Sequence, residues 1–211
     1  MQRSRALRRL PGQAAAATLA ALLALAAVGA QSSTLARAEL DQMLAACVLV
    51  FEGEVVDVRA AREADGIHTW VRFAVLDTIK GAAGDTLSLR FQGGIVAGEG
   101  SEVVGSPIPK LGERGIYFVE ATDRFLVNPL YGWHQGRLLV TRDRAGAARV
   151  QSSAGAPVVS IGAAPAAGVQ GIAAPDETAA GIGVAPGAPL ESALRVEQVK
   201  AALAARLVGR R

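Results

Sequence analysis

The side chains best suited to catalysis are few and far apart in this sequence. The only two histidines, His68 and His134, are separated by 66 positions. A zinc site needs three or four ligands, usually with two at a short spacing, and neither HExxH nor CxxC is present. A metal-dependent hydrolase using His68, His134 and a carboxylate is therefore an alternative that requires the fold to bring distant residues together.

Cys47 is the single cysteine, so no intramolecular disulfide can form. The preceding Leu44-Ala45-Ala46 matches a bacterial lipobox, but charged residues separate it from the apolar N-terminal run that a lipobox must close. We expect Cys47 to be a small buried residue that opens the first strand, with a neutral and unreactive thiol.

Other catalytic signatures are missing from the sequence. It contains no GxSxG elbow and no P-loop, and Gly98-Glu99-Gly100 lacks the third glycine and the following helix of a nucleotide fingerprint. We therefore predict a protein with no catalytic residues, no cofactor and no metal: a non-enzymatic binding or inhibitor-like module.

A glycine- and proline-rich stretch over 92–115 predicts a long loop with short extended pieces at 95–96 and 102–104. Long loops in compact domains often carry binding sites, although an insertion without a partner is an equal alternative. The candidate binding surface combines this loop with the segment around Trp133, and its residues are Gly93, Gly94, Glu99, Trp133, His134 and Gln135.

The N-terminus has the layout of a secretory signal peptide over 1–30, with four arginines, an apolar run over 14–28 and a small-residue cleavage site before Gln31. The run is shorter than a membrane span, so cleavage is favoured over an uncleaved anchor and no stable transmembrane span is expected afterwards. Removing those four of the 22 Lys and Arg residues leaves 18 against 19 Asp and Glu. We predict an extracytoplasmic protein, periplasmic or secreted, with a protein or envelope component as partner and no nucleic acid.

The longest β pattern lies between Cys47 and Phe91. Residues 47–59 and 67–79 alternate between apolar and polar positions and flank Asp65-Gly66, which predicts an antiparallel hairpin. Gly53 inside the first strand indicates a bulge. Residues 85–91 and short apolar runs up to 162 bring the count to five to seven strands.

These patterns predict an all-β fold: a small OB-like or netrin-like antiparallel barrel with a short leading helix and a C-terminal helix. The expected parts are the signal peptide 1–30, the leading helix 31–46, the barrel 47–162, an Ala/Gly/Pro-rich low-complexity linker 163–189 and an amphipathic helix 190–208. That helix has an apolar stripe for docking on its own barrel or on a partner. An envelope structural protein docked through this helix is a further alternative.

The order of segments over about 45–162 resembles a group of bacterial exported proteins of unknown function. Its most telling points are Lys80-Gly81, Gly93-Gly94, Gly112-Glu113 and Gln135-Gly136. The resemblance implies a single β-barrel domain and, since such proteins are sometimes found near matrixin-type metalloproteases, a protease-associated role.

The hairpin and the strand ending at Lys80-Gly81 are also similar to the OB-type barrel of netrin-like domains and tissue inhibitors of metalloproteinases. Those inhibitors place an N-terminal cysteine on the protease zinc. Here the predicted mature terminus is Gln31, Cys47 is internal, and the disulfides of that family are absent. The resemblance therefore does not transfer that mechanism.

Overall fold

A computed structural model describes residues 36–162 and 178–209. The predicted signal peptide 1–30, the start of the predicted leading helix and part of the predicted linker lie outside these ranges. No helix among the described residues is long and apolar enough to cross a membrane.

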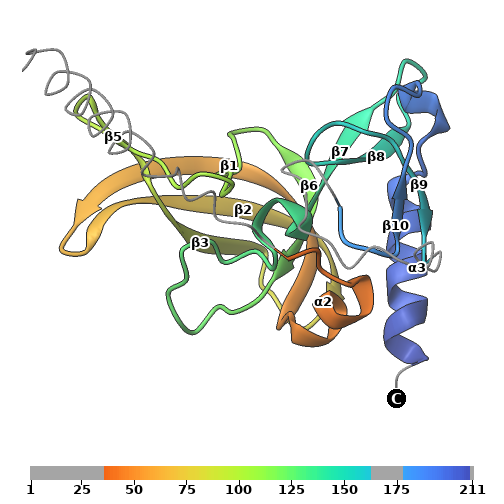
Figure 1. Ribbon diagram of the computed structural model, residues 1–211, viewed down its shortest axis with the longest axis horizontal. Helices are drawn as coiled ribbons and strands as arrows, with labels where there is room; N and C mark the ends of the chain where they lie inside the picture. The colour runs from red at the N-terminus through yellow and green to blue at the C-terminus, as the bar shows by residue number, and fades with distance from the viewer. Residues whose placement is uncertain (1–35, 163–177, 210–211) are drawn as a thin grey trace, which may run out of the picture. The chain divides into compact units, whose positions relative to one another are not determined.

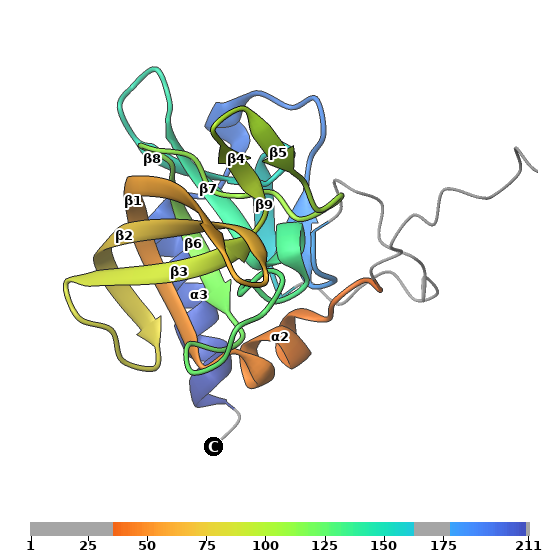
Figure 2. The ribbon, with the colours of Figure 1, turned by 90° about the vertical axis from the view of Figure 1, so that its left-hand side faces the viewer.

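The centre of the fold is an antiparallel sheet with the order β3-β2-β1-β6-β7-β8 (Figures 1 and 2). Its strands are β1 (Leu49–Glu63), β2 (Gly66–Lys80), β3 (Thr86–Gln92), β6 (Arg114–Val119), β7 (Arg137–Arg142) and β8 (Ala148–Ser152). Two further hairpins are β4 (Gly94–Val96) with β5 (Glu99–Ser101), and β9 (Val158–Ile161) with β10 (Ile182–Val184). The helical elements are α2 (Leu40–Ala46), η1 (Trp133–Gly136), η2 (Leu190–Ser192) and α3 (Val196–Val208).

The predicted antiparallel β fold with a short helix before it and a helix at its end is confirmed, and six strands share the main sheet. The predicted closed barrel is not observed. Within the described residues, β3 and β8 do not pair with each other, so they are the two edge strands of an open sheet. The sheet is nevertheless curved (Figure 1), with register shifts along the β1–β2 pair that favour coiling.

The β1–β2 hairpin turns at Ala64 and Asp65, one residue before the predicted Asp65-Gly66, because Gly66 already pairs with Glu63 as the first residue of β2. The pairing extends from there to the Val50–Lys80 pair. One register shift falls between Glu52 and Gly53, which confirms the predicted bulge. A Cβ at Gly53 would lie 2.6 Å from the Phe51 ring, so the close approach of that ring requires glycine.

The first part of strand β1, from Leu49 to Gly53, is buried on both faces, which divides the core in two. Phe51 on one face packs with Phe73 and Tyr117 in an aromatic cluster. Val50 on the opposite face belongs to a second cluster, which contains the apolar residues of α2 and α3. Because successive side chains of a strand point to opposite faces, β1 contributes residues to both cores.

The leading helix is shorter than the predicted 31–46. Glu39 is extended because the backbone on both sides of it pairs with a distant segment: Leu40 N donates to Ala180 O, and Ala180 N donates to Ala38 O. Helix α2 begins only at Leu40. Cys47 follows the helix, and the strand it was expected to open begins at Leu49.

The segment that provides those partners was predicted to be an unordered linker over 163–189, and that prediction is wrong for its described part. Ile182 is buried in β10, which pairs with β9, and Ala179 and Ala180 are buried beside it. Backbone pairing stabilises this stretch, and an Ala/Gly-rich composition does not reveal such pairing.

The C-terminal helix begins at Val196 rather than at 190. Leu194 is held in extended conformation because its N–H donates to Val158 O and its C=O accepts from Val150 N. The apolar stripe of α3, with Val199 and Leu203 fully buried, packs on the face of the sheet that carries Val50. Of the two expected docking places, the helix occupies its own sheet.

This packing predicts the effect of truncating the helix stripe. Leu203→Ala should lower the free energy of unfolding by about 2–5 kcal/mol, because it removes a fully buried side chain and leaves a cavity. Urea unfolding followed by circular dichroism measures the change. Val208→Ala is the control, since Val208 lies on the same helix and is 72% exposed. Equal effects of the two substitutions would contradict the docked position of α3.

Candidate functional site

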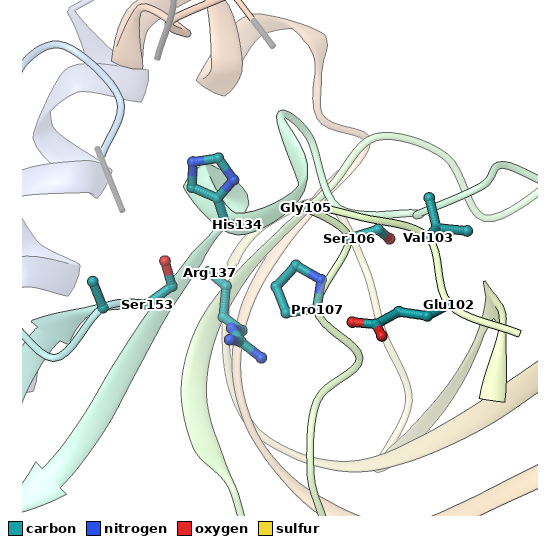
Figure 3. A pocket seen from close by; sticks show the side chains of 9 residues that line it. Glu102, Val103, Gly105, Ser106, Pro107, His134, Arg137 and Ser153 are labelled. Carbon is teal, nitrogen blue, oxygen red and sulfur yellow. The ribbon is translucent and has the colours of Figure 1, made fainter. Parts of the chain in front are cut away.

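Two adjoining hollows lie along the predicted 92–115 loop. One, of about 280 Å³, is bordered by the loop and by His134, Arg137 and Ser153 (Figure 3). The other, of about 690 Å³, is more apolar, with Ile95 and Ile108 in its wall. They share Glu102, Val103, Ser106 and Pro107, and we call them together the loop groove.

The loop is held in place by short-range turns and by buried hydrogen bonds. Ala97 and Gly98, with φ of 52° and 84°, form the turn of the β4–β5 hairpin. Farther along, the Asn128 amide donates to the Ser106 hydroxyl at 3.0 Å, and both residues are buried. The extended piece expected at 95–96 is confirmed as part of β4. The piece expected at 102–104 is wrong, because β4 pairs with 99–101.

The opposite wall of the groove comes from η1 and the start of β7. Gly132 and Trp133 both have left-handed backbone, with φ of 58° and 56°. A Cβ at Gly136 would lie 2.4 Å from Tyr131 O, so the tight turn needs glycine there. This geometry directs His134 and Arg137 toward the loop (Figure 3).

Arg137 is the buried charge of the groove, with 8% of the residue exposed. Its Nη1 lies 3.3 Å from both carboxylate oxygens of Glu113. Its Nε–H has no acceptor among the described residues. Glu113 Oε1 also accepts from the Tyr117 hydroxyl at 3.2 Å. Burial, together with the neighbouring Glu113 charge, raises the pKa of Tyr117, which therefore stays a neutral donor.

The six predicted surface residues have different positions. Gly94 lines the larger hollow and His134 the smaller one. Trp133 is half-buried beside Gly105. Glu99 is exposed on β5, where it pairs with Arg62. None of these placements identifies a ligand.

Gly93 and Gln135 were predicted as binding-surface residues, and the structure corrects both. Gly93 is buried; its N–H donates to Ile67 O and its carbonyl accepts from the Thr69 hydroxyl. Gln135 has no exposed surface, and its Oε1 accepts from Ala38 N at 2.8 Å. Both residues therefore hold backbone segments together.

A second cluster of polar groups lies at the tip of the β1–β2 hairpin. Glu63, Asp65 and His68 have ligand atoms within 4.8 Å of one another, and they are the one such group found among the described residues. His134, the other histidine of the predicted metal alternative, is not a member. Because ionised Asp65 is an acceptor, His68 Nε2 donates to its Oδ1 at 2.9 Å.

Arg90 occupies the place that a metal ion would need in this cluster. Its Nη2 lies 2.8 Å from Asp65 Oδ1 and 3.0 Å from Glu63 Oε2. The ring of Phe125 covers the guanidinium at 4.2 Å. A metal ion would have to displace a buried cation from both carboxylates, so this arrangement favours a structural ion-pair network over a metal centre.

Cys47 is buried and free, as the sequence predicts. Burial raises the pKa of its thiol to about 12, against a smaller lowering effect of Lys80. The thiolate needed for nucleophilic or metal chemistry is thus suppressed at neutral pH.

Several groups of the loop groove were not predicted from the sequence. Arg137 was not among the predicted site residues, because nothing in the sequence around Leu138 and Leu139 distinguishes a buried arginine from an exposed one. Its partner Glu113 is distant in sequence and has no local signature. Comparison of the chain with models of protein families, with curated proteins and with solved structures finds no match in any of the three.

The hairpin cluster predicts an electrostatic effect of Arg90. Its hydrogen bond to Asp65 is the main cause that lowers the pKa of this carboxyl. In Arg90→Gln the pKa of Asp65 should therefore rise toward its ordinary value, as measured by carboxyl ¹³C NMR titration. A depressed folded-state pKa contributes stability above the unfolded-state pKa and loses it as pH falls through the folded value. The substitution should remove this contribution, so the difference in stability between wild type and Arg90→Gln should be largest above the ordinary aspartate pKa and should shrink as pH falls.

The control for this titration is Arg72→Gln, which removes an exposed guanidinium 3.8 Å from Asp57. It should leave the titration of Asp65 unchanged. An Asp65 pKa that is the same in wild type and Arg90→Gln would contradict the assigned role of Arg90.

The burial of Cys47 predicts that its thiol resists alkylation. At pH 8 iodoacetamide should label it only after unfolding in urea, because the folded thiol is both inaccessible and protonated. Mass spectrometry measures the labelling. Val208→Cys provides an exposed thiol on the same chain that should react at once. Equally fast labelling of Cys47 would show that α2 does not cover it.

Proposed function

We propose that the protein is an exported, non-enzymatic binding module, inhibitor-like in action, that holds its partner in the loop groove. The observation that carries the proposal is the groove itself, which consists of two adjoining hollows along one loop. Its lining includes Arg137, which is about nine-tenths buried and has an N–H without an acceptor among the described residues. Clefts with an apolar wall and a few polar groups are the usual form of ligand sites.

Exposed apolar side chains around the groove support a protein or envelope component as partner. Ile95, Val104 and Leu111 all lie in the loop and are 73%, 75% and 69% exposed. Apolar side chains gathered at the surface are typical of interaction sites. The extracytoplasmic location, the absence of nucleic acid among its partners and the protease association come from the sequence. These three expectations are part of this proposal. A relationship of the curved sheet to OB-like folds is also part of it.

The two alternatives have less support. A hydrolase using His68 and His134 would need them at one metal, whereas His68 belongs to the cluster that Arg90 occupies and His134 borders the loop groove. An envelope protein docked through its terminal helix would need a free apolar stripe, whereas Val199 and Leu203 are buried against the protein's own sheet.

Site-specific photo-crosslinking in the exporting cells tests the proposal. A benzophenone amino acid at Ile95 or Val104 should crosslink the partner, because Ile95 lines the groove, Val104 lies in the chain between two residues that line it, and both are exposed. The same group at Leu76 on β2 or Val208 on α3 provides exposed controls away from the loop. Identical products at all four positions, or none at Ile95 and Val104, would refute a partner in the loop groove.

A further inference from the structure

Arg137 has an unused capacity to bind an anion. A buried guanidinium N–H without an acceptor is unfavourable, so such groups in folded proteins call for an explanation. Charge-assisted N–H···O bonds are normally about 2.7–2.9 Å long. Both contacts of Arg137 with Glu113 measure 3.3 Å, and the Nε–H has no acceptor in the described part of the chain. The guanidinium borders the smaller hollow of the loop groove (Figure 3).

Arg90 provides a comparison within the same chain. It is equally buried, and its Nε also lacks an acceptor among the described residues. However, two carboxylates bind its Nη2 at 2.8 and 3.0 Å, and the Phe125 ring covers its face. The charge of Arg90 is therefore matched by two close carboxylates of its own chain, whereas Arg137 has a single carboxylate at 3.3 Å.

The charges around Arg137 limit the kind of anion. Glu113 already contributes one negative charge, and Glu102 borders the same hollow with a second. A dianion such as phosphate would meet repulsion from both, whereas a monoanionic carboxylate matches the planar guanidinium and brings a single charge. Serine hydroxyls of Ser106 and Ser153 lie in the same lining and suit a polar head group.

The adjoining hollow determines the rest of the ligand. It is larger and more apolar, and Ile95, Val103 and Ile108 contribute to its lining. Because the two hollows share four residues, a ligand with its head group at Arg137 extends directly into the apolar part.

We infer that the loop groove takes ligands in which a monoanionic carboxylate stands next to an apolar group. The carboxylate binds Arg137, and the apolar group lies against Ile95, Val103 and Ile108. This inference rests on the proposed function of the groove and specifies its ligand. The same chemistry occurs at the C-terminus of a peptide ending in an apolar residue and in a small branched acid.

Matched acids and amides test the inference by calorimetry on the purified full chain. The peptide pair is N-acetyl-glycyl-leucine and its amide, and the small-molecule pair is 4-methylpentanoate and its amide. Each acid should bind about tenfold or more tightly than its amide, because the acid alone makes the charge-assisted bond. Preference for the peptide acid would identify a chain terminus as the source, and equal binding of both acids would identify a general carboxylate site.

Two variants attribute the preference to Arg137. Arg137→Gln should remove the acid preference and leave amide binding unchanged, while Arg142→Gln, on the same strand and exposed, should change neither. Because Arg137 is buried, its replacement could unfold the chain. Glu113→Gln avoids this difficulty: it removes the competing carboxylate and should raise affinity for the acids severalfold, a gain that damage to the fold cannot produce.

The outcomes separate this inference from the proposed function. Equal binding of acid and amide, no measurable binding of either, or an unchanged acid affinity in Glu113→Gln would overturn the carboxylate inference. If crosslinking from Ile95 and Val104 still succeeded, the groove would remain a binding site for another chemistry. Failure of both experiments would overturn the groove as a site altogether.

Discussion

The structure depends on strand β1 being shared by two cores. Phe51 and Val50, adjacent in sequence, belong to different apolar clusters, and Glu52 next to them is a buried carboxylate. Glu52 accepts from Arg114 at 2.9 Å and from Lys200 at 2.8 Å, which ties β6 and α3 to the same strand. Burial alone would lower the pKa of Lys200, but its hydrogen bonds to Glu52 and Asp77 raise it, so the amine stays charged. Loss of one partner of such a buried group costs about 3–5 kcal/mol.

This constraint also positions the loop groove. Strand β6 pairs with β1 on one side and with β7 on the other, so the register of β1 determines where Gly115 and Tyr117 lie. Tyr117 is paired with Arg137 on β7 and packs its ring on Phe51, while its hydroxyl reaches Glu113. The ion pair at the base of the groove is thus built on the aromatic core, and the 92–115 loop closes over it.

Local patterns predicted the elements that depend on local physics. Alternation in β1 and β2 and the bulge at Gly53 follow from residues close in sequence, and the structure has them. The hairpin turn is also present, shifted by one residue to Ala64 and Asp65. The ends of both helices, at Ala46 and Val208, were predicted correctly, but their starts were not. Each start is set by a distant backbone partner, Ala180 for α2 and Val158 for the segment before α3. Strand β10 was not predicted, because the composition around 178–184 is of low complexity and the strand is stabilised by its pairing with β9.

In the candidate site, too, the features set by local sequence were predicted and the features set by distant residues were not. The glycine-rich loop could be located from composition, because turns with positive φ require glycine at Gly98 and Gly105. Gln135 and Gly93 were misplaced because polar or glycine residues beside a loop can equally satisfy buried backbone groups. Arg137 and Glu113 were not recognised because a pair 24 positions apart has no sequence signature.

Arg90 and Arg137 are both buried, but the groups that surround their guanidinium groups differ. Arg90 closes the tip of the hairpin, where Asp65, Glu63 and the Phe125 ring satisfy its charge within the chain. Arg137 lies at the border of a hollow with an incomplete set of acceptors, and its carboxylate partner is shared with Tyr117. Folding alone would favour a complete set of acceptors or an apolar residue at that position. Arg137 therefore differs from Arg90 in two respects, its single carboxylate at 3.3 Å and its place in the lining of a hollow, and these two observations are the basis of the proposed carboxylate ligand.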